Sequence, residues 1–400
     1  IYIRWAQLFI DEPARYAFFS MNDGKTPLFF WLLAPFQFLF ANQLFAARFV
    51  GVLIGFVQML VLIKTTALFT KNKVTIYLSG LLVAILPFWY LHHRMALTDG
   101  LLTLFISVSM FFLLKDLLAQ KNVQYASYLE LWQQLLEKKT LQNIAISGLF
   151  FGLALLSKIP AILAIPSFLV LTVLVPVKSK NNLFLALHKV GLSTAIGLGL
   201  FSLLLFSPSF GQLFSRGGDF LLPLSEVLSG KWQETLPNIP NYIAYFSSYT
   251  TIFFLIFIFF GLFDKKNKIP VHVFLWAALL FIFPIATLGK VVYARYLLPA
   301  LIFLTLAGVF AIEAVFVTLY QRVQQKFVQS VLLLVAVLCF ANMITYSSSF
   351  IYYSITDHTN VPFVASDRTQ YLTEWSSGHG LVETVQLLQE HAKTQTVAVA

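Results

Sequence analysis

The sequence predicts an all-helical polytopic membrane protein, and two observations carry this prediction. The first is composition: 58% of the 400 residues are hydrophobic and 11% are charged, whereas a soluble domain has about 25% charged residues. The second is the length of its apolar runs, because a run of roughly 17–25 residues can cross a bilayer as a helix. We expect ten spans, at residues 44–68, 74–91, 100–117, 141–157, 160–177, 183–206, 241–262, 270–289, 295–318 and 328–347.

Basic residues gather in alternate connections between these runs, and this pattern predicts the orientation. The richer set contains Lys64, Lys71, Lys73, Lys115, Lys121, Lys138, Lys139, Lys178, Lys180, Lys189, Lys265, Lys266, Lys268, Arg322 and Lys326. The poorer set contains Arg94, Lys158, Arg216, Lys231, Lys290 and Arg295. The positive-inside rule places the richer set in the cytoplasm. The net charge of +10 therefore reflects membrane orientation, and we expect no binding of nucleic acid.

Three extracytoplasmic regions flank the predicted membrane domain, residues 44–348. Residues 1–43 form a first outer loop with two interfacial helices, because Pro27–Ala41 is only about 15 residues long and a crossing there would invert every later loop. Residues 207–240 form the second region. Residues 349–400 begin a soluble α/β or α+β domain, which we expect to be truncated at a strand starting near Thr396. An outside start also requires one further span upstream of Ile1.

Five ionisable residues lie at or near the outer edge of the membrane: Lys25, Arg94, Asp99, Lys158 and Arg295. Such residues are costly at membrane depth and usually functional. Four cations around one carboxylate suggest an anionic, lipid-borne substrate, since Arg and Lys clamp phosphates, and the carboxylate is then a candidate general base. The competing interpretations are that Asp99 only caps the next helix and that Lys158 and Arg295 only extend to the interface.

Metal and thiol chemistry have weaker support in the sequence. His92 and His93 are candidate metal ligands, but adjacent residues in a turn seldom converge on one ion. The sequence leaves a divalent metal open as a cofactor and indicates no other. Cys339, the single cysteine, lies in an apolar run, which excludes a disulfide framework and a cysteine metal site. The pair Asp11 and Glu12 either ends an interfacial helix or takes part in catalysis.

Five short motifs occur in a characteristic order along the chain. They are Lys25-Thr26-Pro27-Leu28, Phe45-Ala46-Ala47-Arg48, Arg94-x-Ala96-x-x-Asp99, Gly152 to Ser157-Lys158, and Arg295-Tyr296-Leu297-Leu298-Pro299. On these motifs the chain resembles the GT-C membrane glycosyltransferases, specifically the group of dolichyl-phosphate-mannose-protein mannosyltransferases and bacterial aminoarabinose transferases. It departs from that group at Thr26, where Pro is usual.

The resemblance implies an inverting glycosyltransferase of the cell membrane, with its active site outside the cytoplasm. The donor would be a polyprenyl-phosphate sugar, and the acceptor a hydroxyl of a lipid, protein or glycan. Lys25, Arg94, Arg295 and Lys158 would bind the donor phosphate, and Asp99 would serve the acceptor or base side. The acid of the first loop would lie just upstream of Ile1, with Tyr2 and Ala6 matching the residues that follow it.

Two other functions remain open at this point. A flippase or transporter of a lipid-linked saccharide should show interrupted helices in two related halves, with charges near the membrane midplane. The sequence shows no internal repeat, and its charges gather on one predicted face. A membrane scaffold for the C-terminal domain would leave those one-sided cations unexplained.

Overall fold

The protein is helical throughout the part of the chain that its computed structural model describes, namely residues 1–120, 128–174, 180–215, 217–231, 233, 235–264, 268–322, 325–374 and 381–396. Over these residues the sole β-type pairing is an isolated bridge between Leu221 and Gly289, so the predicted all-α class is confirmed. Several features singled out above lie outside the described residues: Lys121, Lys178, Arg216, Lys265, Lys266 and the predicted strand at 397–400.

Seven uninterrupted helices are long and apolar enough to cross a membrane. They are α4 (Gln43–Thr66), α7 (Thr98–Ala119), α9 (Lys138–Ser157), α11 (Lys180–Phe201) with its extension η5 (Ser202–Phe206), α16 (Lys268–Leu288), α17 (Ala300–Arg322) and α18 (Lys326–Thr356). They correspond to seven of the ten predicted spans. The protein is a multi-pass membrane protein.

Two further predicted spans are bent pairs of helices. Helices α5 (Lys73–Ile85) and α6 (Pro87–His93) meet at 57°, where Pro87 removes a backbone donor and starts a new helix. Helices α14 (Ile239–Tyr249) and α15 (Ile252–Gly261) meet at 93°. Thr251 makes this bend with a φ of 67° and caps α15 by accepting a hydrogen bond from the Phe254 amide. With each pair counted once, up to nine spans are present in the described residues.

The tenth predicted span, residues 160–177, is described only to residue 174 and is not one continuous α-helix. In place of one helix, η3 (Ile159–Leu163), α10 (Ala164–Leu171) and η4 (Thr172–Leu174) form a broken apolar segment. Pro160 and Pro166 each remove a backbone donor from it, and 3₁₀ turns flank its α-helical part. The segment of α3 (Leu28–Leu33) and η2 (Ala34–Phe38) is a short apolar segment too, and its placement at the membrane interface stays a prediction.

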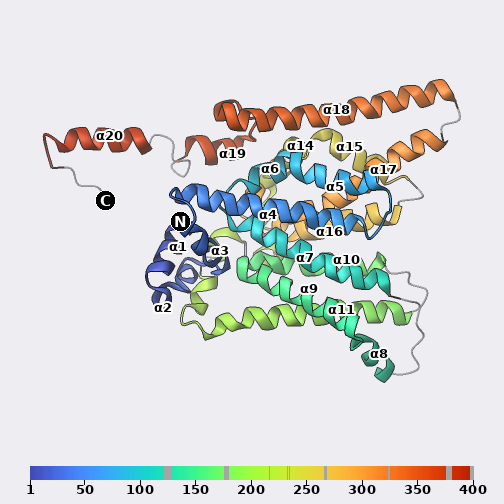
Figure 1. The fold of residues 1–400 in the computed structure, drawn as a ribbon, viewed down its shortest axis with the longest axis horizontal. Helices are drawn as coiled ribbons and strands as arrows, with labels where there is room; N and C mark the ends of the chain where they lie inside the picture. The colour runs from blue at the N-terminus through green and yellow to red at the C-terminus, as the bar shows by residue number, and fades with distance from the viewer. Residues whose placement is uncertain are drawn as a thin grey trace.

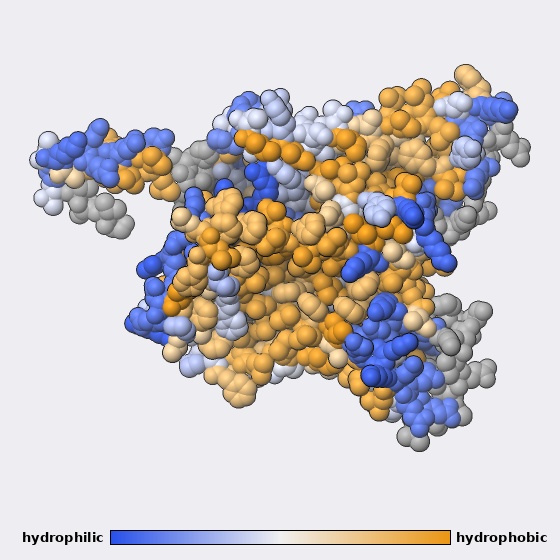
Figure 2. Space-filling model, in the orientation of Figure 1, coloured by the Kyte–Doolittle hydropathy of each residue, from blue (hydrophilic) through white to orange (hydrophobic). Residues whose placement is uncertain are grey.

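The helices run between two polar ends separated by an apolar belt (Figures 1 and 2). At one end lie α1 (Tyr2–Asp11), α2 (Pro13–Tyr16) and α3, and the chain after α18 emerges from the same end (Figure 1). At the opposite end lie the connections from α4 to α5, from α7 to α9 through α8 (Tyr128–Leu135), and from α17 to α18 (Figure 1). The arrangement therefore separates the predicted outer elements from the predicted basic loops.

Helices α7 and α17 form the centre of the bundle and are the most buried of the spans. Helix α9 packs on α7 and also on α11. The α9–α11 crossing is close because Gly148 and Gly152, four residues apart, face α11; a Cβ on Gly148 would lie 2.6 Å from the Ile196 side chain. Small residues at this spacing allow helices to approach closely in membranes. The crossing fixes α9, whose C-terminal end carries Lys158.

The polar end also holds short elements that surround the start of α7. They are η1 (Phe19–Asp23), η6 (Phe210–Phe214), α12 (Gly217–Phe220), α13 (Leu224–Leu228), η8 (Leu236–Asn238), η9 (Ala294–Leu297), η10 (His358–Asn360), α19 (Ala365–Arg368) and the π-turn η11 (Thr369–Thr373). Helix α20 (Leu381–Ala392) follows and buries none of its residues. Helix α18 continues to Thr356, past the predicted end at residue 347.

Candidate active site

An ion pair joins Asp99 and Lys158 at the polar end that carries α1–α3. Asp99 lies in the first turn of α7, and Lys158 follows the last residue of α9 in an extended conformation. The Lys158 Nζ lies 2.6 Å from Asp99 Oδ1. The Asp99 side chain is 5% exposed and the Lys158 side chain is 26% exposed. The carboxylate is therefore buried, while its partner remains accessible from outside the bundle.

The structure does not support a purely capping role for Asp99. The N-cap of α7 is Leu97, which makes no side-chain cap hydrogen bond. The Asp99 carboxylate instead accepts its hydrogen bond from Lys158. Lys158 likewise pairs with a buried acid and does not simply extend into the interface.

Arg295 lies next to this pair and is held between aromatic rings. The short helix η9, between α16 and α17, places the guanidinium carbon 4.5 Å from the Tyr293 ring centroid and 5.5 Å from that of Tyr296. The Lys158 ammonium lies 4.4 Å from the Tyr296 centroid. Tyr296 therefore stands between two cations, an arrangement in which ring faces attract positive charge. We refer to Asp99, Lys158, Arg295 and Tyr296 as the Asp99 cluster.

The electrostatics of Arg295 follow from its neighbours. Burial alone would lower its pKa, but the Asp99 carboxylate and the phenols of Tyr371 and Tyr296 raise the pKa above its ordinary value. The described residues offer the guanidinium no carboxylate within ion-pair distance. A charged guanidinium with unused donors beside an ammonium group can bind a phosphate.

Tyr2 borders the cluster from the first interfacial helix. Its phenol lies beside the Thr98 hydroxyl, and burial together with the nearby Asp99 charge raises its pKa. Its ring contacts Trp5 and Phe29 edge to face, with centroids 5.5 and 5.2 Å away. These contacts fix α1 over the start of α7, so the first loop forms one wall of the cluster.

Lys25 and Arg94, the other two predicted phosphate ligands, are not brought to Asp99. Lys25 pairs with Asp23 and lies 5.3 Å from the centroid of the Trp5 ring. Arg94 is exposed, stacks on Tyr90, and donates hydrogen bonds to the hydroxyls of Tyr90 and Ser354. The Trp5 ring thus lies between Lys25 and Tyr2, and Arg94 faces α18.

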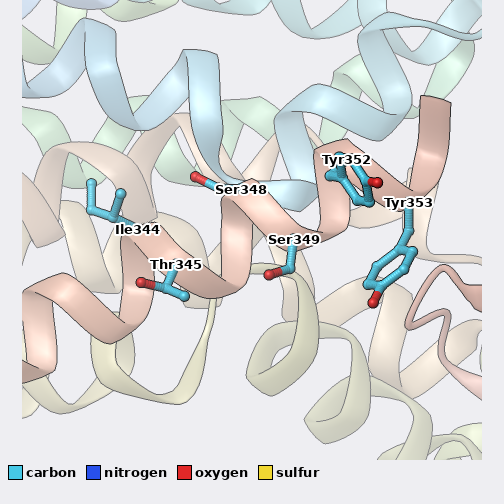
Figure 3. A pocket seen from close by; sticks show the side chains of 6 residues that line it. All are labelled: Ile344, Thr345, Ser348, Ser349, Tyr352 and Tyr353. Atoms are coloured by element: carbon cyan, nitrogen blue, oxygen red, sulfur yellow. The ribbon is translucent and has the colours of Figure 1, made fainter. Parts of the chain in front are cut away.

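A groove on α18 lies on the side of the bundle that Arg94 faces, and Figure 3 shows its lining side chains. Its volume is about 380 Å³ and its walls carry mostly hydroxyls, from Thr345, Ser348, Ser349, Tyr352 and Tyr353, with Ile344 at one end. None of these residues belongs to the Asp99 cluster. The groove and the cluster are therefore separate features.

His92 and His93 both make packing or hydrogen-bonding contacts inside the protein. His92 Nδ1 lies 2.7 Å from the Phe88 carbonyl oxygen within α6. His93 stacks on Trp89, and a Cβ on Gly55 of α4 would lie 2.8 Å from the His93 side chain. In the part of the chain that the structure describes, no three His, Cys, Asp or Glu side chains group to hold a metal ion. His93 packs the turn before Asp99 against α4.

Two residues of the C-terminal region approach the cluster without any signal in the sequence. Asp367 in α19 is fully buried and accepts a hydrogen bond from the Tyr249 hydroxyl at 2.8 Å. Burial raises the pKa of Asp367 to about 6, although Tyr249 and Arg295 oppose the shift. Tyr371 in η11 lies against Arg295. Neither residue belongs to a motif, and they reach the site only because the chain folds back after α18.

One comparison reports a family likeness for part of the chain. Residues 24–209 match the family model described as dolichyl-phosphate-mannose-protein mannosyltransferase. Slightly less than half of the chain is therefore similar to this family. The matched residues include Lys25, Arg94, Asp99 and Lys158, while Arg295 lies beyond them. The comparison with curated proteins gives no match.

Several solved structures are similar to the chain at low identity. ArnT from Cupriavidus metallidurans in the apo state is 15% identical, with 78% of this chain and 54% of ArnT covered at a TM-score of 0.49. Its structure bound to undecaprenyl phosphate is 14% identical, with 82% and 62% covered at 0.46. The oligosaccharyltransferase AglB from Archaeoglobus fulgidus, with an inhibitory peptide and a dolichol-phosphate, is 11% identical, with 82% and 47% covered at 0.46. The chain spans roughly half the length of these proteins, and such scores carry no further argument.

Proposed function

We propose that this protein transfers a sugar from a polyprenyl-phosphate donor to an acceptor hydroxyl on the extracytoplasmic face of the membrane. The observation that carries the proposal is the Asp99 cluster, in which an accessible Lys158 lies beside one buried carboxylate, together with Arg295, which has no ion-pair partner among the described residues. The family match supports the reaction class. Asp99 and Lys158 lie at the ends of two apolar helices long enough to cross a membrane, so a lipid-borne substrate can approach the cluster from the membrane.

The proposed reaction is a single displacement with inversion at the anomeric carbon. The acceptor oxygen loses its proton to a carboxylate and forms a bond to that carbon, while the bond between the carbon and the phosphate oxygen breaks. The polyprenyl phosphate leaves with the bonding electrons, and Arg295 and Lys158 stabilise its charge. The base is the first-loop acid that the family resemblance implies upstream of Ile1. Asp99 positions Lys158 and the acceptor hydroxyl.

Binding of undecaprenyl phosphate to the full-length protein in nanodiscs tests the donor site. We expect Arg295→Gln to weaken binding on the order of 10- to 100-fold, the loss typical of a charge-assisted hydrogen bond to an anion. Arg94→Gln is the matched control, because this second arginine at the same end lies outside the cluster. Equal affinities for wild type and Arg295→Gln would remove Arg295 from the site. Translocation of a lipid-linked saccharide without any transfer would favour the flippase alternative.

The membrane orientation has its own test by single-cysteine labelling after Cys339 is replaced. We expect an impermeant reagent added from outside to label position 23 and not position 72, because the positive-inside rule places the basic loops in the cytoplasm. The reverse pattern would put the Asp99 cluster on the cytoplasmic face and overturn the proposed site of reaction.

A further inference from the structure

The chain that follows α18 is anchored over the polar end by specific contacts to α14. Tyr249 donates to Asp367 Oδ2 at 2.8 Å and accepts from the Val364 amide at 3.1 Å. The Tyr245 and Ser366 hydroxyls lie 2.7 Å apart. Phe363 packs edge to face on Phe350 of α18, with ring centroids 5.9 Å apart. These contacts hold residues 361–373 in one position next to η9.

This anchored segment presents polar atoms that the rest of the described chain leaves without hydrogen-bond partners. The Tyr371 hydroxyl and Asp367 Oδ1 are both buried and unpaired among the described residues. The Tyr371 hydroxyl lies close enough to the Arg295 guanidinium for the two groups to attract each other, although no hydrogen bond of ordinary geometry joins them. A buried hydroxyl without a partner costs free energy in the unliganded protein. Burial and the nearby Asp367 raise the pKa of Tyr371, so its phenol stays protonated and can donate.

We propose that Tyr371 is a further binding residue for the donor phosphate, supplied by the chain after the last membrane span. In this arrangement Arg295 and Tyr371 donate hydrogen bonds to phosphate oxygens from adjacent positions, and the contact between Tyr249 and Asp367 fixes the segment that carries Tyr371. The inference rests on the proposed function and deepens it. It means that the donor site is complete only when residues 361–373 are docked on α14.

The competing role for Tyr371 is packing alone, since its ring centroid lies 6.0 Å from that of Phe363. The substitution Tyr371→Phe separates the two roles, because it keeps the ring and removes the hydroxyl. A packing role predicts no change in ligand affinity. A binding role predicts weaker phosphate binding together with an unchanged or higher unfolding midpoint of the unliganded protein, because the lost hydroxyl has no partner there.

The experiment compares wild type, Tyr371→Phe and the control Tyr320→Phe in the full-length protein. Tyr320 is exposed at the opposite end of α17. The probes are undecaprenyl phosphate and the neutral alcohol undecaprenol, both titrated in nanodiscs. For Tyr371→Phe we expect a loss of phosphate affinity on the order of 10- to 100-fold and little change for the alcohol. Tyr320→Phe should match wild type for both probes.

Each other outcome overturns a distinct claim. Undiminished phosphate affinity in Tyr371→Phe, with normal wild-type binding, overturns the role of Tyr371 and leaves the proposed function standing. An equal loss for phosphate and alcohol assigns Tyr371 to packing against the lipid chain. A lower unfolding midpoint of unliganded Tyr371→Phe shows that its hydroxyl has a structural partner, which also overturns the inference. Failure of wild type to bind undecaprenyl phosphate overturns the proposed donor and this inference with it.

Discussion

Helix α7 carries two buried ion pairs, one near each end, and they differ in what surrounds them. Asp99 pairs with Lys158 at 2.6 Å, and Asp116 pairs with Lys189 of α11 at 2.7 Å. The acids are equally buried, at 5% exposure each, but Lys158 is 26% exposed and Lys189 only 4%. The first pair can therefore meet a ligand, and the second cannot without opening the bundle.

The residues around the two pairs also distinguish the accessible pair from the closed one. The second pair has Asn143 of α9 within 3.4 Å of Asp116. One layer away, the hydroxyls of Ser109, Ser147 and Ser193 join α7, α9 and α11 by hydrogen bonds of 3.1 and 2.8 Å. The first pair has a second cation, Arg295, and open aromatic faces. The distance between the charged atoms thus does not distinguish a functional pair from a structural one. The exposure of the lysine and the presence of a further cation do.

The largest expected effect is on catalysis by Asp99→Asn, measured as sugar transfer in membranes at matched protein level. Asn keeps the size of the side chain but removes the charge that orients Lys158. We expect a loss of about 10²–10⁴-fold, the usual contribution of an acid–base group or its support. The paired variant Asp116→Asn should alter turnover less than threefold once corrected for the amount of folded protein. Near wild-type transfer in Asp99→Asn would show that the accessible pair is also structural.

The second effect is on stability, and it should appear only at the closed pair. Lys189→Met leaves Asp116 buried without its cation, which costs about 3–5 kcal/mol when one partner of a buried pair is removed. We expect a lower unfolding midpoint in detergent and a lower amount of protein in membranes. Lys158→Met should cost less, because Lys158 is itself 26% exposed and water weakens its ion pair.

The double variant Asp116→Leu, Lys189→Met provides the control for that comparison. Replacement of a buried pair by apolar residues of similar volume is often neutral or stabilising, so the double variant should recover most of the stability. If the double variant is as unstable as Lys189→Met, the loss of stability comes from the packing of the lysine methylenes. The two ion pairs of α7 would then not differ for electrostatic reasons.

Another buried carboxylate, Asp367, has no lysine partner in the part of the chain that the structure describes and should respond to pH. Its pKa is raised from 3.8 to about 6 by burial, with Tyr249, Arg295 and Tyr371 as the groups that face it. Because the docked state then binds the proton more tightly, docking of residues 361–373 is strongest below about pH 4. It weakens by up to about 2–3 kcal/mol as pH rises through 6, at about 1.4 kcal/mol per pKa unit.

Hydrogen-exchange protection of residues 361–373, corrected for the intrinsic pH dependence of exchange, measures this effect. Protection should be higher at pH 5 than at pH 7.5 in wild type. Asp367→Asn should show the same protection at both values, because the amide does not titrate. Protection that rises with pH in wild type would mean that ionised Asp367 stabilises the docked segment.

The sequence predicted the membrane class, and it placed Asp99 and Lys158 at the same edge of the membrane, because both predictions depend on local signals. Apolar length marks a span, and a charge beside an apolar run marks an interface. The bends at Pro87 and Thr251 were missed because the apolar pattern continues through them. Lys189 was assigned to a basic loop, yet it lies buried on α11, since its partner Asp116 is far away in the sequence.

The composition of the site could be predicted only in part for the same reason. Arg94 and Asp99 are five residues apart, but α6 ends at His93 and turns Arg94 toward α18, while Asp99 starts α7. Asp367 and Tyr371 reach Arg295 through tertiary contacts made by the tyrosines of α14. No spacing rule in the sequence reports contacts that depend on how a chain folds back onto a bundle.

The smallest expected effect is that of Arg94→Gln, and it tests the border of the cluster. Arg94 is exposed, stacks 4.9 Å from the Tyr90 centroid, and bonds to Ser354 at 3.0 Å. Surface substitutions of this kind usually change stability by no more than about 0.5 kcal/mol. We expect the affinity for undecaprenyl phosphate to change less than threefold, because a solvated cation outside the cluster contributes little to a buried phosphate site. A loss as large as that of Arg295→Gln would instead place the lipid phosphate on the α18 side, beside the hydroxyl groove of Figure 3. The exposed Lys158 and the additional cation Arg295 beside Asp99 would then no longer identify the donor site.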